Sequence, residues 1–182
     1  MIYVFLAKGF EEIEALATVD ILRRAELEVV TVGIGDDVVA GSHGMVVLAD
    51  TTDFDLPLDP GTLDMIVLPG GLPGTLNLEG SKNVQTAVDF CLENNKYVAA
   101  ICAAPSILGH RGLLDGKTVT AHHGFREEVG GGNYTGAPVE VDGNIITARG
   151  AGVTVQFALK LVELLKGKPA ADKIKMAMGC DF

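Results

Sequence analysis

Residues 2–34 read IYVFLAKGFEEIEALATVDILRRAELEVVTVGI, and this stretch decides the fold class. Residues 2–7 form a short continuous apolar run, which predicts a buried strand. Residues 11–25 follow a turn and predict a helix, because acidic side chains stand in its first turn and Arg23 and Arg24 in its last. Residues 28–34 predict a second strand. The stretch is therefore a strand–helix–strand unit, the building block of a parallel sheet.

The same alternation of short apolar strands and helices continues along the chain. Further strands are predicted at residues 45–48, 65–68, 97–101 and 117–120, and a hairpin is predicted around Asp142-Gly143. Helices are predicted at residues 81–94, after Cys102 as far as about Leu108, and at 153–165, while residues 50–63 predict a loop. This pattern predicts an α/β fold with a mostly parallel central sheet and helices on both faces. In such sheets ligands bind at the carboxyl ends of the strands.

Length and charge exclude several classes of protein. A chain of 182 residues can bury about 70% of its surface, so a single domain over residues 1–182 is expected. Fourteen basic against twenty-four acidic residues give a net charge of −10, which argues against nucleic acid or an anionic membrane surface as partner. The sequence contains neither an apolar run of about 20 residues nor a signal-peptide pattern, so we expect a soluble cytoplasmic protein.

Three cysteines, an odd number, argue against a disulfide framework, and no Cys/His spacing suggests a structural zinc site. Cys91 lies on the apolar face of a predicted helix and is expected in the core. Cys180 stands near the end of the chain, where we expect it to be exposed and incidental. Cys102 follows a predicted strand directly. A cysteine at a strand-to-helix turn lies near a positive helix end, which lowers its pKa and favours a nucleophilic thiolate. The alternative is a small buried hydrophobe.

The turn after the strand at 65–68 contains two glycines, Gly70 and Gly71. Glycines at such a position let backbone amides approach an oxyanion. The alternative is an ordinary tight turn. Neither GxGxxG nor a GK[ST] ending is present, so the turn does not carry a phosphate-binding motif.

Two further side chains could take part in acid–base chemistry. The helical neighbours of Glu14 three, four and seven positions on are all uncharged, which is compatible with a partly buried carboxyl of raised pKa. Glu11 and Glu12 have similar neighbours, however, so this pattern alone favours the alternative, a solvated helix carboxylate. His122 and His123 follow a predicted strand, where a histidine can act as a general base or orient one, or can simply belong to a loop. In extended backbone the two rings point to opposite sides, so at most one is expected to face a shared site.

Five ordered blocks of the sequence resemble the ThiJ/PfpI superfamily, and within it the branch of the parkinsonism-associated protein deglycase and its bacterial relatives. The blocks are AKGFEEIEALATVDILRRA from Ala7, VLPGGLPG from Val67, AAICAAPSIL from Ala99, TVTAHH from Thr118 and IITARGAGVTVQFAL from Ile145. They span the chain to about Lys168. The resemblance implies a flavodoxin-like α/β sandwich and a homodimer.

The resemblance also implies roles for individual residues. It implies that Cys102 is a nucleophile at a sharp turn, that a protonated Glu14 hydrogen-bonds its sulfur, and that the amides of Gly71 and Ala103 form an oxyanion pocket. His122 matches the family's histidine near the cysteine.

One position matches the family pattern at a second pocket, and two positions depart from the pattern. Arg24 matches an arginine near a dimer-side pocket, to which we also assign Gly70. Ala103 stands where the protease-like branch has a histidine, and His43 where the deglycase pattern often has an arginine. The first departure argues against peptidase activity. The second bears on how an anion near Cys102 is stabilised.

These features predict a cysteine enzyme without cofactor or metal. The expected substrates are reactive dicarbonyls such as methylglyoxal, or their adducts with protein or nucleotide groups. The alternative is a redox sensor or stress chaperone in which Cys102 is oxidised to a sulfinic acid. An amidotransferase-like hydrolase shares the cysteine turn but needs a histidine and a glutamate late in the chain, and no histidine follows Glu140.

Overall fold

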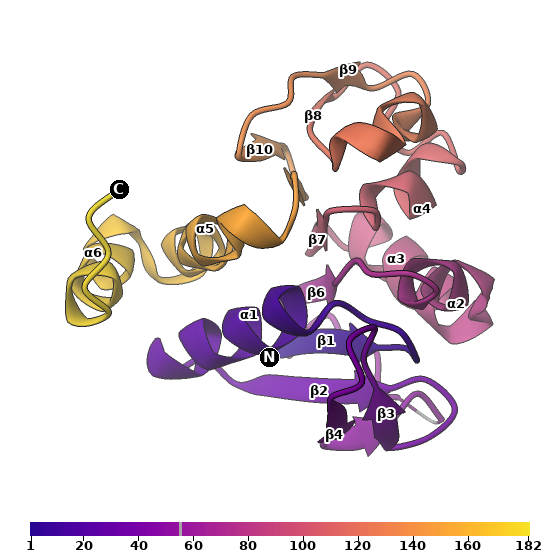
Figure 1. Ribbon diagram of the computed structural model, residues 1–182, viewed down its shortest axis with the longest axis horizontal. Helices are drawn as coiled ribbons and strands as arrows, with labels where there is room; N and C mark the ends of the chain where they lie inside the picture. Colours follow the sequence, from indigo (N-terminus) through magenta and orange to yellow (C-terminus); the bar gives the residue numbers. More distant parts are fainter. Residues whose placement is uncertain (55) are drawn as a thin grey trace.

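A seven-stranded sheet forms the centre of the computed structural model, which describes residues 1–54 and 56–182 (Figure 1). From edge to edge its strands are β10 (Val139–Asp142), β11 (Ile145–Ala148), β7 (Tyr97–Ile101), β6 (Met65–Leu68), β1 (Ile2–Leu6), β2 (Val29–Gly33) and β5 (Thr51–Thr52). Only β10 runs antiparallel to its neighbour within this sheet. The predicted α/β class is therefore confirmed. The central strands β1, β6 and β7 place the chain segments that follow them side by side.

Alternation along the strands builds two cores. In β1, Ile2, Val4 and Leu6 point to one face of the sheet, while Tyr3 and Phe5 point to the other. All five side chains are at most 1% exposed, so the strand is apolar on both faces. This is why residues 2–7 lack the apolar–polar alternation of a half-exposed strand.

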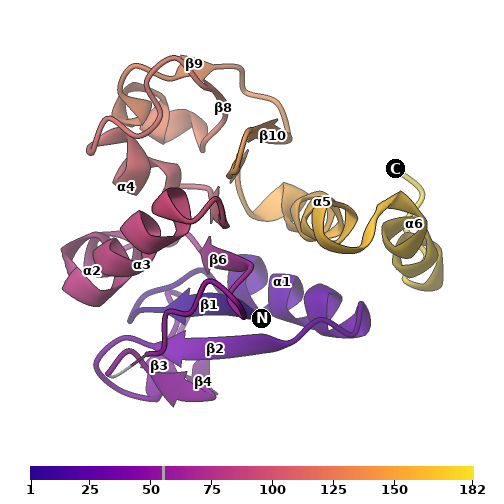
Figure 2. The ribbon, with the colours of Figure 1, turned by 180° about the vertical axis from the view of Figure 1, so that it is seen from behind.

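The helices cover the two faces separately (Figures 1 and 2). One face packs against α1 (Glu12–Arg24) and α5 (Thr154–Lys166), and α6 (Lys168–Ala177) packs on α5. The other packs against α2 (Gly74–Gly80), α3 (Lys82–Glu93) and α4 (Pro105–Gly109). The first turn of α1 thereby lies over the carboxyl ends of the central strands.

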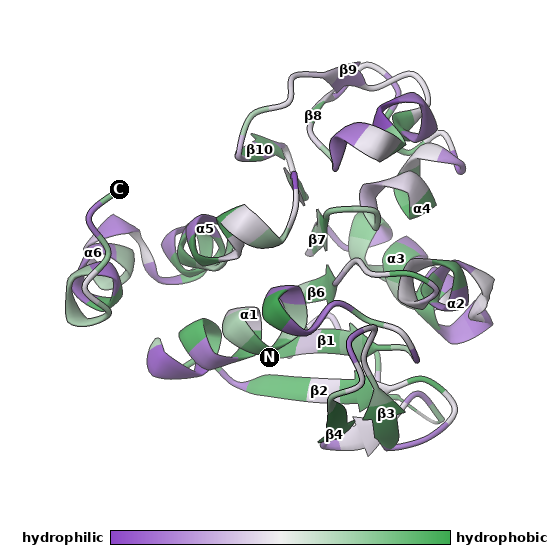
Figure 3. Ribbon diagram, viewed as in Figure 1, coloured by the Kyte–Doolittle hydropathy of each residue, from purple (hydrophilic) through white to green (hydrophobic). Residues whose placement is uncertain are grey.

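Two small sheets stand outside the central one. The hairpin of β3 (Val38–Ala40) and β4 (Val46–Leu48) projects beside β2, and β8 (Thr118–Val119) pairs with β9 (Asn133–Tyr134). The hairpin strands are hydrophobic in sequence (Figure 3), yet Val38, Val46 and Leu48 are 55%, 65% and 71% exposed. The hairpin therefore carries an apolar surface that this chain does not cover.

The structure corrects the sequence-based prediction in several places, among them strands β3 and β9, which the sequence did not predict. The predicted loop at 50–63 contains β5, which extends the sheet beyond β2; Asp55 of that loop lies outside the described residues. Helices α2 and α6 were not predicted. The strand predicted at 117–120 is shorter and pairs with β9 instead of joining the central sheet. In residues 1–54 and 56–182, no helix combines the length and the hydrophobicity needed to cross a bilayer.

Candidate active site

Cys102 stands directly after β7 in a backbone conformation that few side chains adopt. Its φ is +64°, which costs energy for a residue other than glycine and is concentrated at functional sites. Neighbouring backbone holds it: the Cys102 N–H donates to the Ala148 carbonyl at 2.8 Å, and its carbonyl accepts the His122 N–H at 2.8 Å. The predicted sharp turn is thus present, clamped between two later segments of the chain.

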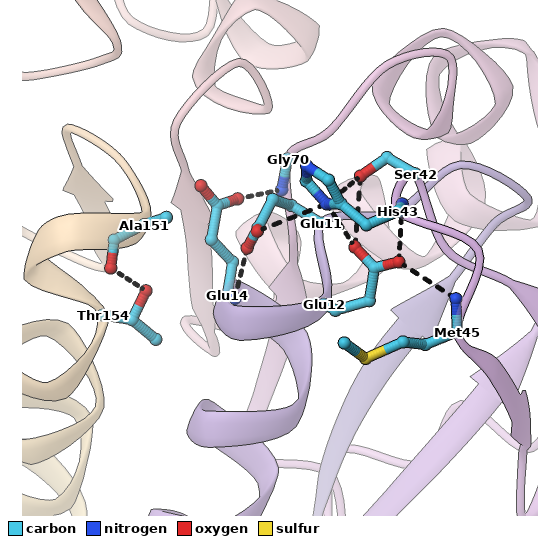
Figure 4. Close-up of polar contacts among 9 residues, drawn as sticks. All are labelled: Glu11, Glu12, Glu14, Ser42, His43, Met45, Gly70, Ala151 and Thr154. Atoms are coloured by element: carbon cyan, nitrogen blue, oxygen red, sulfur yellow. Dashed lines mark hydrogen bonds and ion pairs between the residues drawn. The ribbon is translucent and has the colours of Figure 1, made fainter.

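Glu14 is fully buried in the first turns of α1 and reaches the same point. Its Oε2 accepts the Gly70 N–H at 2.8 Å, the only hydrogen bond drawn to this carboxylate in Figure 4. Its Oε1 is buried without a hydrogen-bond partner of good geometry among the described residues. A Cβ on Gly70 would lie 2.7 Å from both Glu14 Oε2 and the Cys102 Cβ, so only glycine lets these two side chains come together here.

Burial sets the protonation of this pair. Burial raises the pKa of Glu14 to about 7, although the Cys102 thiol and the Gly70 amide partly oppose it. Burial, followed by the charge of Glu14, raises the pKa of Cys102 to about 12, and the Ala103 amide only partly offsets this. The raised pKa agrees with the protonated Glu14 that the resemblance implies, whereas the solvated carboxylate favoured by the local pattern is wrong. The prediction that a helix end lowers the pKa of Cys102 is wrong, because the thiol is buried and a carboxylate lies beside it, while α4 begins only at Pro105.

A cavity of about 660 Å³ opens beside the pair. Both His122 and His123 line it, with ring centroids 4.1 Å apart. The expectation that only one ring could face the site is wrong, because the backbone turns into a 3₁₀-helix, η1 (His123–Val129), at this point. Burial and the neighbouring ring of His123 lower the pKa of His122, so its imidazole is neutral at pH 7 and can accept a proton. The other lining residues are Glu11, Glu14, Cys102, Ala121, Tyr134, Gly136, Arg149 and residues 150–153.

The remaining predicted site residues lie at different distances from the sulfur. The Ala103 amide hydrogen-bonds the Cys102 side chain. Gly71, with φ of +91°, packs so closely on the turn at Gly9 that a Cβ would lie 2.6 Å from the Gly9 carbonyl oxygen. Arg24 pairs with Asp20 at the far end of α1, about 15 Å along the helix from Glu14. The structure therefore does not bring Arg24 to Cys102 within this chain.

The neighbouring carboxylate of Glu12 points away from Glu14 and serves a different purpose (Figure 4). Its oxygens accept from the His43 amide at 2.7 Å, His43 Nδ1 at 2.9 Å, the Ser42 hydroxyl at 3.2 Å and the Met45 amide at 3.4 Å. Burial alone would raise the pKa of Glu12, but these hydrogen bonds lower it to about 2. Glu12 therefore fastens the hairpin turn to α1.

Glu11, Glu12 and His43 bring ligand-type atoms within 4.8 Å of one another. His43 is exposed, and its hydrogen bond to Glu12 raises its pKa, which makes it an ion-pair partner. The hydrogen bonds of the group account for the arrangement without an ion. The absence of a metal and of a cofactor stays a prediction.

The three cysteines differ in access, which predicts their order of alkylation. Cys91 is fully buried, and burial raises its pKa to about 12, whereas half-buried Cys102 lines the cavity. We expect iodoacetamide at neutral pH to label Cys102 well before Cys91, as measured by peptide mapping after brief treatment. Equal or faster labelling of Cys91 would contradict this placement. Cys180 is half-buried rather than exposed as predicted, and it does not decide the test.

The raised pKa of Glu14 predicts a pH-dependent cost to stability. Between its ordinary value of 4.5 and about 7, the folded protein holds a proton that the unfolded chain releases, so stability falls as pH rises through this window. We expect Glu14→Gln to increase the free energy of unfolding at pH 8 by up to about 3 kcal/mol. At pH 4, where Glu14 is protonated in the folded protein, the two proteins should be much closer in stability.

Urea denaturation of both proteins at the two pH values measures this. Histidines whose pKa is raised, such as His43 and His110, are common to both proteins, so their contributions cancel in the difference. If the difference in unfolding free energy between the two proteins is the same at pH 4 and at pH 8, Glu14 does not titrate between these two pH values.

Comparison with known proteins identifies the family of this chain. The model of the DJ-1/PfpI family matches residues 1–164. The chain belongs to the DJ-1/PfpI family. Extension of a single domain to all of residues 1–182 stays a prediction, because this match ends at 164.

Individual relatives of this DJ-1/PfpI member cover nearly the whole chain. It is 38% identical to the Parkinson disease protein 7 homolog of Danio rerio over 94% of this chain and 93% of the relative. It is 31% identical to the glutathione-independent glyoxalase DJR-1.2 of Caenorhabditis elegans over 86% and 83% of the two chains. Drosophila melanogaster DJ-1beta superposes with a TM-score of 0.94 at 33% identity, covering 100% of this chain and 98% of that structure. The predicted superfamily and flavodoxin-like fold are therefore confirmed.

Sequence reasoning missed two polar side chains of the cavity in this DJ-1/PfpI member, Tyr134 and Arg149. Arg149 offered a signal, because it stands two residues after the strand predicted to end at Thr147, and ligand-binding residues of parallel sheets collect beyond strand ends. Tyr134 offered none, since it belongs to a long connection without regular periodicity.

Proposed function

We propose that this protein converts reactive dicarbonyls such as methylglyoxal to hydroxy acids without a cofactor. The observation that supports it is the contact between Cys102 and the buried carboxyl of Glu14 at the rim of the cavity. Coupled groups lose their protons in steps that belong to the pair. The pair loses its first proton near pH 7 and its second only near pH 12. Above about pH 7 it therefore holds one negative charge, which the sulfur and the carboxyl can share.

The chemistry begins when this charge lies on the sulfur and Glu14 carries the proton. The thiolate adds to the aldehyde carbon, the carbonyl π electrons move to its oxygen, and protonation of that oxygen gives a hemithioacetal. Glu14, as a carboxylate again, removes the proton from this carbon and delivers it to the adjacent ketone carbon, while the hydroxyl proton of the hemithioacetal passes to the ketone oxygen. The result is a thioester of the 2-hydroxy acid. Water cleaves the thioester, releases lactate and restores the thiol, so methylglyoxal plus water gives lactic acid.

Backbone amides and His122 complete the proposal. The Ala103 amide, already directed at the sulfur, and the Gly71 amide stabilise the negative oxygen that develops at the attacked carbon. His122 is neutral at pH 7 and lines the cavity, so it can orient the hydrolytic water. Glycated protein or nucleotide groups are further substrates under this proposal, because each releases or presents the same carbonyl group.

Lactate formation is the direct test. Purified protein with methylglyoxal, a metal chelator and no glutathione should form lactate in repeated turnovers, measured with lactate dehydrogenase. Absence of lactate would contradict the proposal. If low peroxide then adds two oxygens to Cys102, measured by mass spectrometry, the redox-sensor alternative replaces it.

A homodimer is the proposed assembly. Ile13 on α1 is 57% exposed, and Val38, Met45, Val46 and Leu48 of the hairpin are likewise more than half exposed, so both elements present apolar side chains to water. Burying such a surface in a two-fold contact removes apolar area from water. Light scattering at micromolar concentration should give about twice the 19.0 kDa of one chain.

Two matched variants make the dimer prediction specific. Leu48→Glu should give monomers, while Met176→Glu, the same change at a 77% exposed position on α6, should leave the dimer intact. A wild-type mass of one chain would contradict the assembly itself.

A further inference from the structure

The cavity beside Cys102 has charged groups of opposite sign on different elements. Glu11 and Glu14 belong to the start of α1, whereas His122, His123 and Arg149 come from the two segments that follow β8 and β11. A three-carbon dicarbonyl occupies only a small part of about 660 Å³, a volume within the range of sites for larger ligands, about 300–1,000 Å³. The cavity therefore has room for a substrate that extends away from the sulfur.

Arg149 is anchored close to the reactive cysteine. It is the residue after Ala148, whose carbonyl accepts the Cys102 N–H. Its own N–H donates to the Pro138 carbonyl at 3.2 Å, and its Nη1 donates to the Gly136 carbonyl at 3.2 Å. These bonds hold the backbone and one edge of the guanidinium. The side chain remains exposed at the cavity, with most of its five N–H donors available.

Arg149 also differs from the other four arginines in its pairing. Arg23, Arg24, Arg111 and Arg126 each form an ion pair with an aspartate or glutamate. Arg149 pairs with no carboxylate in the part of the chain that the structure describes, although the chain carries 24 acidic residues. A guanidinium held at a reactive cavity without an internal counter-ion is suited to a carboxylate or phosphate of a ligand.

We propose that Arg149 determines substrate specificity, by binding a carboxylate or phosphate at the far end of a carbonyl substrate and presenting its aldehyde to Cys102. This inference rests on the proposed function and names its substrate class: an anionic oxoaldehyde in preference to a neutral one. The negative charge of Glu11 on the α1 side favours the same orientation, because it repels the anionic end toward Arg149.

Alkylation of Cys102 tests this without turnover. Iodoacetate and iodoacetamide have nearly the same shape and differ by one negative charge. The ratio of their rate constants at Cys102, measured by mass spectrometry, should fall about fivefold in Arg149→Gln, the size of one solvent-accessible charge interaction. Arg149→Lys should keep part of the ratio. Arg111→Gln removes the same charge from an arginine paired with Asp89 on another surface, and should leave the ratio unchanged.

Two further measurements complete the test. Inorganic phosphate and acetate, added separately as competitors, should slow the iodoacetate reaction of the wild type, and the stronger competitor identifies the preferred anion. In turnover, Arg149→Gln should lower kcat/KM for 4-carboxyphenylglyoxal about fivefold more than for neutral phenylglyoxal.

The outcomes separate this inference from the proposed function. A folded Arg149→Gln variant with the wild-type alkylation ratio, or an equal fall in Arg111→Gln, would overturn the role of Arg149. Absence of lactate with an altered alkylation ratio would instead overturn the dicarbonyl chemistry and leave the anion site in place.

Discussion

Cys102→Ser is expected to abolish lactate formation from methylglyoxal. A serine hydroxyl stays protonated over the range in which Glu14, with a pKa of about 7, can accept a proton, so the first bond to the aldehyde carbon does not form. The loss in kcat/KM should be about 10³-fold or more, as for removal of other covalent nucleophiles. Lactate formed per enzyme under steady-state conditions measures it.

Cys180→Ser is the matched control for this variant. It makes the same chemical change at a half-buried cysteine close to the end of the chain and should retain wild-type activity. Circular dichroism should be the same for all three proteins, since one sulfur-to-oxygen exchange at either position leaves the two cores unchanged. A folded Cys102→Ser variant with wild-type lactate production would end the nucleophile proposal.

Glu14→Gln is expected to lower kcat/KM by about 10²–10⁴-fold, the usual contribution of a general acid–base group. The amide neither accepts the thiol proton nor carries a proton between the two substrate carbons. The wild-type rate should rise through about pH 7, where the pair loses its first proton, and this step should disappear in the variant. His122→Ala should lower kcat/KM less than Glu14→Gln does, because orienting a water molecule contributes less to catalysis than transferring the proton.

A control for this variant is Glu163→Gln, which removes an acid paired with Lys160 on α5. It should keep both the rate and the pH profile. If the Glu14→Gln variant instead keeps the wild-type pH profile, a group other than Glu14 causes the rise in rate near pH 7. Together with the denaturation measurements, Glu14→Gln should be more stable than the wild type at pH 8 and less active, as expected where a buried charge serves catalysis.

Elements with strong local signals could be predicted from the sequence, whereas elements defined by tertiary contacts could not. The strand at 65–68 and the helix from Ser81 onward agree closely with β6 and α3, because an apolar run and a capping serine are local features. The two residues of β5 are a strand only because β2 lies beside them. Helix α2 begins after Pro73 without a side-chain cap and contains two glycines, so its propensity alone resembles a turn.

The candidate site shows the same division. Cys102 and Glu14 were predicted as a pair, and the structure brings them together across Gly70. The ionisation of Cys102 was predicted with the wrong sign, because local sequence shows a nearby helix but not a buried carboxylate supplied by a residue 88 positions away. The common orientation of His122 and His123 depends on a change of backbone conformation at η1 that residue types alone do not indicate.

The hydrogen bond from Cys102 to Ala148 has a consequence for synthesis of the protein on the ribosome. The thiol is translated about 46 residues before the strand that fixes its backbone, which corresponds to roughly 2–9 s at ordinary elongation rates. During that interval β7 lacks its β11 neighbour and the cysteine turn lacks its clamp. The backbone conformation of Cys102 is therefore fixed only after the last strand of the sheet has emerged, and a nascent chain stalled before β11 lacks this turn.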